Sequence, residues 1–231
     1  MKDVKQLIGL IIFISLTQNL LGQPRSKDYY WGVKAGAVFP TNLGRSDDEI
    51  GFKDVASTGF ISGLTAGWNY NERLSLAAEL NYQYLPKKES FWNVESKGTF
   101  SANYQSSSLL ITGNYHFSSE GWRPYCGVNF GMHYLRNRID FNSKYNGTDN
   151  DASIDYTATE WHPGFGCQFG TMVELTKNTQ LVLETRLSII PYLKEKMVPI
   201  MDGDLVTDYF TKNPHGNQNQ LSITIGINFS M

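Results

Sequence analysis

The sequence of 231 residues has little net charge and no long apolar run after its first 25 residues. Its 20 basic and 22 acidic residues nearly balance, so no overall electric field favours nucleic acid or an anionic surface as a partner. No stretch of about 18 apolar residues follows residue 25, which excludes membrane-spanning helices there. The mean hydropathy of -0.33 still permits a membrane barrel, because barrel strands alternate apolar and polar residues.

Cysteine is scarce as well. The 2 cysteines, Cys126 and Cys167, and the 4 histidines have no spacing that fits a zinc site, and neither a metal nor a cofactor is indicated. Both cysteines fall on the apolar faces of predicted neighbouring strands. An exported protein can form disulfides, but their geometry is demanding, so we expect free thiols that act as small apolar side chains.

The N-terminus has the pattern of a secretory signal. Lys2 and Lys5 precede an apolar run from Leu7 to Leu16, which is too short to span a bilayer and fits the core of a signal peptide. We expect residues 1–22 to be removed by cleavage near Gly22. The remaining residues, 23–231, would then form one exported domain. A retained N-terminal helix is the alternative, and the position of the charges disfavours it.

Alternation with a period of two residues dominates the rest of the chain. In the segment LSLAAELNYQY, for example, Leu76 and Leu80 lie on one face and Glu79 on the other. The same pattern predicts eight strands, at residues 30–39, 61–70, 74–84, 108–117, 125–134, 164–173, 180–189 and 221–231.

The connections between these segments differ in length in a regular way. Three links are short, and the other four are long and polar, at residues 40–58, 86–103, 136–158 and 191–218. Short turns on one side, long loops on the other and an even strand count are typical of outer-membrane barrels. The sequence therefore predicts an all-β, eight-stranded antiparallel up-and-down transmembrane β-barrel with both termini in the periplasm.

Glycine indicates which face of each strand points inward. Ten glycines fall on the polar faces, where a water-exposed strand would gain nothing from them and a crowded lumen would need them. The apolar faces then contact lipid. Aromatic residues near the strand ends on these faces would form two interfacial girdles: Trp31, Trp68, Tyr70, Tyr82, Tyr84, Tyr115, Phe117 and Tyr134.

Several motifs resemble those of a known family. The segments WGVKAG, PYCGVNFG, GFGCQFG and INFSM are similar to the outer-membrane β-barrel domain family, which includes PorT-like proteins. The resemblance implies an OmpA/OmpX-like architecture in the outer membrane of a Gram-negative cell, surrounded by lipid and lipopolysaccharide. It also implies that Phe229 in the last strand is read by the barrel-assembly machinery.

The predicted lumen contains charged and titratable side chains that would be costly to bury alone. We expect them to pair as a structural plug, in preference to a proton relay, a conductance path or a catalytic group. They are Lys34, Glu79, Glu184, Arg186, His116 and His133. The other two histidines, His162 and His215, are expected to be polar rim or loop residues.

Two loop segments suggest further roles. Asp149, Asp151 and Asp155 could hold calcium, but their loop lacks the glycine and terminal glutamate of the EF-hand pattern. The apolar patch Met197–Met201 would either fold over the barrel mouth or bind a partner, and closure of the mouth is favoured.

These features predict a monomeric, non-enzymatic barrel with a plugged lumen. It would act through its extracellular loops or as an accessory in envelope assembly or protein secretion, with envelope proteins as partners. One alternative is a small lipid-modifying outer-membrane enzyme, although no nucleophile motif is visible. Another is a soluble, lipocalin-like exported barrel that binds a ligand, which would require the aromatic faces to point inward.

Overall fold

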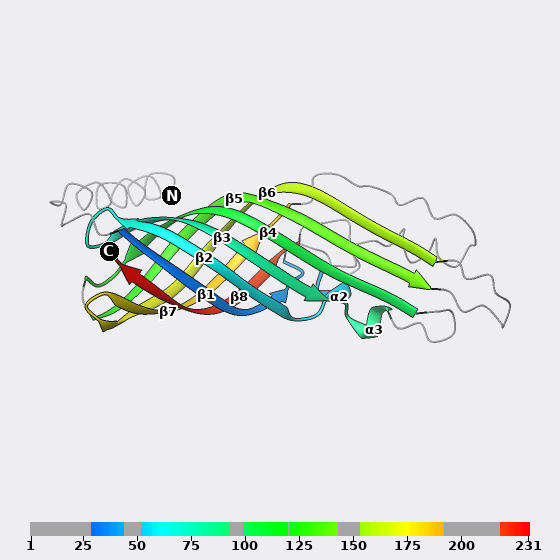
Figure 1. Cartoon of the computed structure of the whole chain (residues 1–231), viewed down its shortest axis with the longest axis horizontal. Helices are drawn as coiled ribbons and strands as arrows, with labels where there is room; N and C mark the ends of the chain where they lie inside the picture. The colour runs from blue at the N-terminus through cyan, green and yellow to red at the C-terminus, as the bar shows by residue number, and fades with distance from the viewer. Residues whose placement is uncertain (1–28, 44–51, 93–98, 120, 143–152, 192–217) are drawn as a thin grey trace, which may run out of the picture.

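In the computed structural model the chain forms one closed antiparallel barrel (Figure 1). The structure describes residues 29–43, 52–92, 99–119, 121–142, 153–191 and 218–231. Each strand pairs with its neighbours in sequence, and β1 closes the barrel against β8, so the predicted up-and-down topology is confirmed. The strands are β1 (Tyr29–Pro40), β2 (Gly59–Asn69), β3 (Leu74–Pro86), β4 (Thr99–His116), β5 (Trp122–Asn142), β6 (Ser153–Thr176), β7 (Thr179–Ile189) and β8 (Gln220–Ser230).

The two faces of each strand have the predicted orientation. Along β3, Glu79 is 3% exposed inside the barrel, whereas its neighbour Leu80 is 55% exposed outside. Aromatic rings such as Phe169 also lie on the outer surface. The lipocalin-like alternative required these rings to point inward and is therefore wrong.

Glycine allows large side chains to cross the lumen. A Cβ atom at Gly67 would overlap the ring of Tyr30, which is almost fully buried. Gly170 has the same relation to Tyr125 on the neighbouring strand. The inward-facing glycines therefore provide the close approach that packs a narrow barrel.

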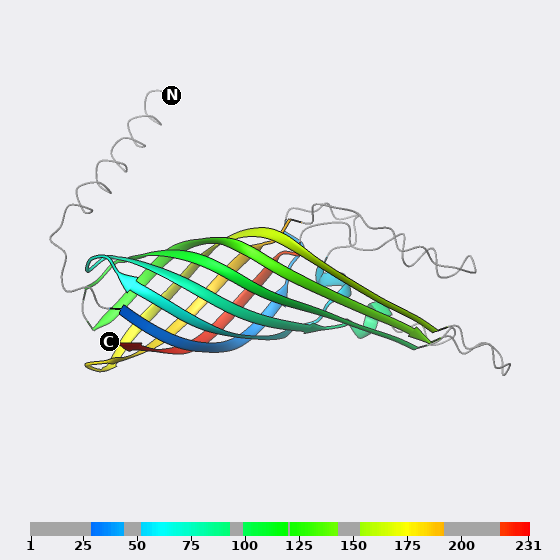
Figure 2. The same ribbon diagram turned by 45° about the horizontal axis from the view of Figure 1, so that its top comes forward.

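Three strands continue beyond the barrel as a projecting sheet (Figure 2). The outer parts of β4, β5 and β6 pair with one another as far as Thr99, Asn142 and Ser153. The predicted long loops were therefore wrong at residues 99–103 of the first and at residues 136–142 and 153–158 of the second, which belong to strands. The outward residues Gln105 and Arg136, which pair in this region, are polar, so the apolar alternation ends there although the backbone pairing continues.

A short segment of the first long link folds over the barrel mouth at the end that carries the long links. Within the described residues the structure has two short helices, α2 (Phe52–Val55) and α3 (Glu89–Trp92). We call Phe52, Val55 and Ala56 the apolar lid, because all three side chains are at most 2% exposed. The Phe52 ring packs edge-on against Tyr104, with centroids 5.3 Å apart. Backbone hydrogen bonds from Ser57 to Pro86 (2.8 Å) and from Lys88 to Val55 (2.9 Å) fasten the lid to the rim.

No helix among the described residues is long and apolar enough to cross a membrane.

Candidate functional site

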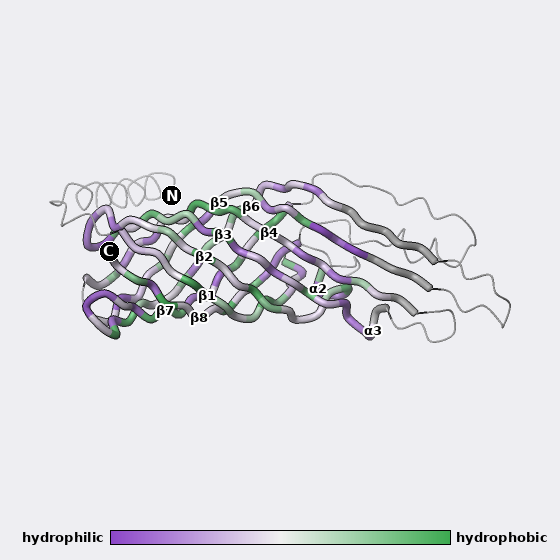
Figure 3. Tube along the Cα trace, viewed as in Figure 1, coloured by the Kyte–Doolittle hydropathy of each residue, from purple (hydrophilic) through white to green (hydrophobic). Residues whose placement is uncertain are grey.

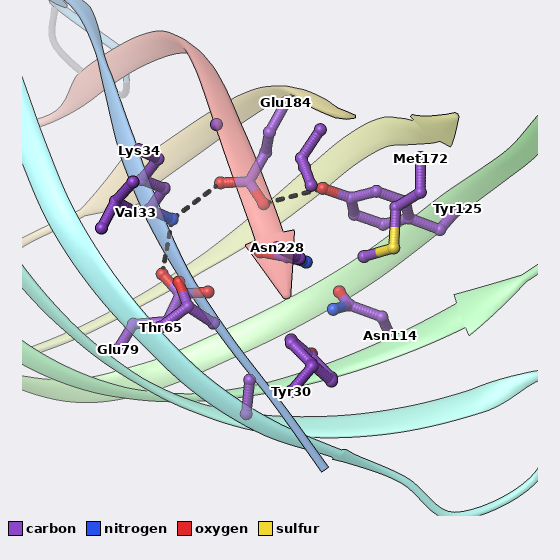
Figure 4. Close-up of a pocket in the computed structure, with 13 residues that line it drawn as sticks. Tyr30, Val33, Lys34, Thr65, Glu79, Asn114, Tyr125, Met172, Glu184 and Asn228 are labelled. Carbon is purple, nitrogen blue, oxygen red and sulfur yellow. Dashed lines mark hydrogen bonds and ion pairs between the residues drawn. The ribbon is translucent and has the colours of Figure 1, made fainter. Parts of the chain in front are cut away.

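Four charged side chains meet in the middle of the lumen, and we call them the ion cluster: Lys34 from β1, Glu79 from β3, and Glu184 and Arg186 from β7. Figure 4 shows the first three of them. Nη2 of Arg186 donates to both carboxylate oxygens of Glu79 (2.8 and 2.7 Å) and to Oε1 of Glu184 (2.9 Å). Nζ of Lys34 donates to Oε2 of Glu79 (2.7 Å) and to Oε1 of Glu184 (3.1 Å). The cluster thus joins strands on opposite sides of the barrel.

Two hydroxyl groups complete the contacts of the carboxylates. The Thr112 hydroxyl donates to Oε1 of Glu79 at 3.0 Å, and the Tyr125 hydroxyl donates to Oε2 of Glu184 at 2.9 Å. Each carboxylate oxygen therefore accepts at least one hydrogen bond, and two cations balance two anions. Because the four side chains are at most 8% exposed, this compensation is what makes their burial tolerable.

The strand register explains how these side chains reach one another. Lys34 pairs across the ladder with Gly63 of β2 and Gly226 of β8. Glu184 likewise pairs with Gly170 of β6. Small neighbours on both sides leave room for long side chains to extend across the lumen.

Little free space adjoins the ion cluster. A cavity of about 30 Å³ lies on its periplasmic side, lined by Tyr30, Met172 and the cluster residues Lys34, Glu79 and Glu184, among others (Figure 4). This volume holds roughly one or two waters.

Uncharged polar side chains fill the neighbouring parts of the lumen. The Gln168 amide donates to Asn114 Oδ1 at 2.8 Å and accepts from Asn129 Nδ2 at 3.3 Å. His116 forms a hydrogen bond of 3.0 Å with Ser75, and its ring lies beside Tyr125. His133 is 2% exposed and pairs across the ladder with His162. Both predicted lumen histidines are therefore inside the barrel but outside the ion cluster.

Comparison with known proteins places this architecture in a family. A family model described as "Outer membrane protein beta-barrel domain" matches residues 13–229. The chain belongs to this outer-membrane barrel family. None of the curated proteins matches the sequence.

Solved structures of other outer-membrane proteins align with this family member. A major outer-membrane protein from Thermus thermophilus aligns at 12% identity over 88% of this chain and 99% of its own, with a TM-score of 0.51. Neisserial surface protein A aligns at 16% identity over 87% of this chain and 96% of its own, with a TM-score of 0.47. At these identities the first likeness supports the fold alone.

The outward aromatic residues of this outer-membrane barrel lie near the two ends of its strands. At the periplasmic end Trp31 stacks on Phe229 (4.7 Å), Trp68 packs on Tyr70, and Tyr115 packs on Phe117. At the extracellular end Tyr82 and Tyr84 lie against Phe60, and Tyr134 lies against Trp161. Phe60 and Trp161 were missed because each lies just outside a predicted strand. We call Tyr82, Tyr84, Phe60, Tyr134 and Trp161 the outer girdle.

Other predicted residues have the following positions. His162 lies within β6 with 2% exposure, so its placement on the rim was wrong, and its Nε2 is 3.4 Å from Glu160. Cys126 and Cys167 are free thiols and are not direct cross-strand partners, because Cys126 pairs with Phe169. Among the described residues no group of three or more His, Cys, Asp or Glu side chains could hold a metal ion.

Several predictions concern residues that the structure does not describe. The following predictions lie outside the described residues: the signal peptide at residues 1–22, Asp149, Asp151, Met197–Met201 and His215. Asp155 is described only in its backbone. The role of Phe229 in assembly stays a prediction. So does that of the barrel-assembly machinery as a partner.

Proposed function

We propose that this outer-membrane barrel does not conduct solutes and acts by binding at its extracellular face. The ion cluster carries this proposal, because it reaches across the lumen from β1 and β3 to β7. A solute would have to separate buried charges that satisfy one another, and this costs much free energy in a narrow lumen from which water is largely excluded.

The apolar lid supports a closed lumen at a second position, the barrel mouth. Phe52 and Val55 are buried at the mouth together with inward-facing residues of the strands, including Leu85 and Tyr104. A polar solute entering from outside would meet this apolar layer before the ion cluster. Two barriers of different chemistry thus lie along one path.

The projecting sheet is the part best placed to bind a partner. In the described chain, residues 153–164 of β6 pair with β5 only, since the ladder with β7 begins at Phe165 and Ile189. An unpaired strand edge presents backbone donors and acceptors to an extended segment of another protein. The part of this edge beyond Trp161, residues 153–160, lies on the extracellular side of the outer girdle.

We further propose that the barrel is not an enzyme. Glu79 and Glu184 are the carboxylates closest to an acid–base pair, but each binds both cations of the cluster. A general acid or base needs access to substrate, and these two groups lie between the barrel walls. The accessory role in envelope assembly or secretion stays a prediction.

Ion conductance tests the closed lumen directly. The purified, heat-modifiable protein would be reconstituted into planar bilayers and, in parallel, into liposomes for swelling in sugar solutions. We expect no steady conductance and no sugar entry. Stable channels or sugar-dependent swelling would refute the closed lumen.

Crosslinking in intact cells tests the binding surface. A photoreactive amino acid at Thr159, which is exposed on the projecting part of β6, should yield a defined protein adduct. The same group at Lys177, exposed in the periplasmic turn between β6 and β7, is the matched control. Equal labelling at both positions, or none at Thr159, would contradict binding through the projecting sheet.

A further inference from the structure

Two arginines lie directly above the outer girdle on the outer face of β5. The alternation that turns Met132 and Tyr134 outward continues to Arg136 and Arg138, which are exposed, while Leu135 between them is 1% exposed. In Figure 3 this part of β5 is strongly hydrophilic where it leaves the barrel. A cationic patch thus replaces the apolar outer surface within two residues of Tyr134.

Polar side chains on both neighbouring strands flank Arg136. Across the ladders, Arg136 pairs with Gln105 of β4 and with Thr159 of β6. One step farther out, Arg138 pairs with Asn103. The patch therefore combines guanidinium, amide and hydroxyl donors on one face of the sheet, the set of groups that binds phosphate oxygens.

The patch lies at the height of the lipid headgroups. From Trp122 at the periplasmic end to Tyr134, β5 rises roughly 30 Å along the barrel axis, at ~3.3 Å per residue and a tilt of ~40°. The apolar band of such barrels is about 25 Å tall. Arg136, beyond Tyr134, is thus placed at the outer membrane–water interface.

A groove opens on the membrane-facing wall below the patch. It has a volume of about 420 Å³, and its outward walls are formed by Val33, Leu64, Leu80, Ser62, Tyr82 and Ser107. Its floor is the row of Lys34, Gly63 and Asn81, whose side chains turn inward and leave backbone on the outer surface. Small hydroxyl residues between large aliphatic ones create the hollow.

The groove and the patch are continuous. Ser107, at one end of the groove, pairs with Tyr134, and Gln105, two residues farther along β4, pairs with Arg136. Because the strands tilt, the cross-strand rows rise toward the outside from β1 to β6. An elongated apolar group in the groove would therefore point its polar end toward the arginines.

We propose that this surface is a binding site for a phosphate-bearing lipid of the outer leaflet. One acyl chain occupies the groove between Leu64 and Tyr82, and the phosphate binds Arg136 and Arg138 with help from Gln105. The occupant must be amphipathic, because the groove faces hydrocarbon while the patch is cationic. Thr159 of the β6 edge adjoins Arg136, but the proposed contacts are made by Arg136, Arg138 and Gln105, so the site does not depend on the proposed partner at that edge.

Lipid binding to the purified full-length chain tests the site. Diphosphorylated lipid A would be titrated into the protein in dodecyl maltoside, and bound lipid counted by native mass spectrometry. Arg136→Gln combined with Arg138→Gln should weaken binding about tenfold or more, since charge-assisted hydrogen bonds to phosphate are lost. Arg73→Gln, at the exposed periplasmic end beside Tyr115, is the matched control and should change affinity by less than about twofold.

Two further experiments distinguish a lipid site from a site that binds only an anion. Ser107→Trp fills the groove without changing any charge and should also weaken lipid binding about tenfold. Inorganic phosphate alone should fail to displace the lipid. Equal binding of lipid A stripped of its phosphates, unchanged binding by either variant, or full displacement by inorganic phosphate would overturn the proposal. Heat-modifiability of each variant verifies that the barrel has folded.

Discussion

The middle of the lumen and its extracellular mouth are filled in opposite ways. The middle holds four charged side chains and the hydroxyls that saturate them. The mouth holds the apolar side chains of Phe52, Val55 and Leu85, which are almost fully buried. Both regions exclude solvent. The middle depends on each charged group having its specific partner, whereas the mouth depends on the close packing of apolar side chains.

The difference follows from the backbone that carries each region. Glu79 and Arg186 project from strands whose ladders are paired on both sides, so their separation is fixed by the whole barrel. Buried charges need this precision, because a misplaced partner leaves an uncompensated ion. The lid comes from a link between strands, and apolar packing tolerates small displacements better than a charge pair does.

Removal of one cation from the ion cluster should cause the largest loss of stability. Arg186→Met leaves Glu79 and Glu184 with Lys34 as the remaining cation of the cluster, and we expect a loss of ~3–5 kcal/mol in the free energy of unfolding. Urea unfolding in lipid vesicles, followed by tryptophan fluorescence, measures it. The cause is the surplus negative charge and not the missing volume, since methionine fills similar space.

A charge-balanced double variant separates these causes. Arg186→Met with Glu79→Gln keeps Lys34 and Glu184 as a pair 3.1 Å apart. It should be more stable than Arg186→Met alone, although two groups have changed. If the two substitutions simply add their losses, charge compensation is not what stabilises the lumen.

A charge on the outer wall at the same depth should be the next most damaging change. Leu80 neighbours Glu79 in the chain but faces lipid between Leu64 and Leu109. Leu80→Arg should cost ~2–4 kcal/mol, the range for a cation near the bilayer midplane.

Leu76→Arg is the matched control on the same face of β3. Leu76 pairs with Trp68 and lies roughly 10 Å closer to the periplasm, at ~3.3 Å per residue and a tilt of ~40°. Its cost should fall to ~1 kcal/mol or less, because the arginine reaches the interface. Unfolding in the same vesicles gives both values. Equal costs would place Leu80 away from the midplane.

The strands and their orientation could be predicted because both depend on a local pattern. Alternation with a period of two residues identifies a strand, and glycine beside Lys34 or Glu184 marks the crowded side. The presence of four charged side chains in the lumen could also be predicted, because Lys34, Glu79, Glu184 and Arg186 all fall on the polar faces of their strands.

The exact contacts could not be predicted, because they depend on long-range register. Nothing local says that Arg186 reaches Glu79 across the barrel while His133 does not join them. The projecting sheet was missed because Arg136 and Gln105 replace the apolar outer residues above the membrane. The lid was missed because Phe52 and Val55 show no periodicity within a polar link.

The smallest effect on global stability should come from the mouth. Phe52→Ala removes the ring that packs against Tyr104, a change that costs ~3–5 kcal/mol in a closed core. Because the lid is fastened by a few hydrogen bonds at the rim, we expect most of this loss to appear as local opening of the lid. The global free energy of unfolding should fall by less than ~1 kcal/mol.

Trypsin cleavage after Lys53, read by mass spectrometry, should accelerate strongly in Phe52→Ala. Leu43→Ala, at a residue near the mouth that is 50% exposed, should leave cleavage unchanged. A large drop in global stability with no change in cleavage would mean that the mouth, like the middle, is an integral part of the barrel.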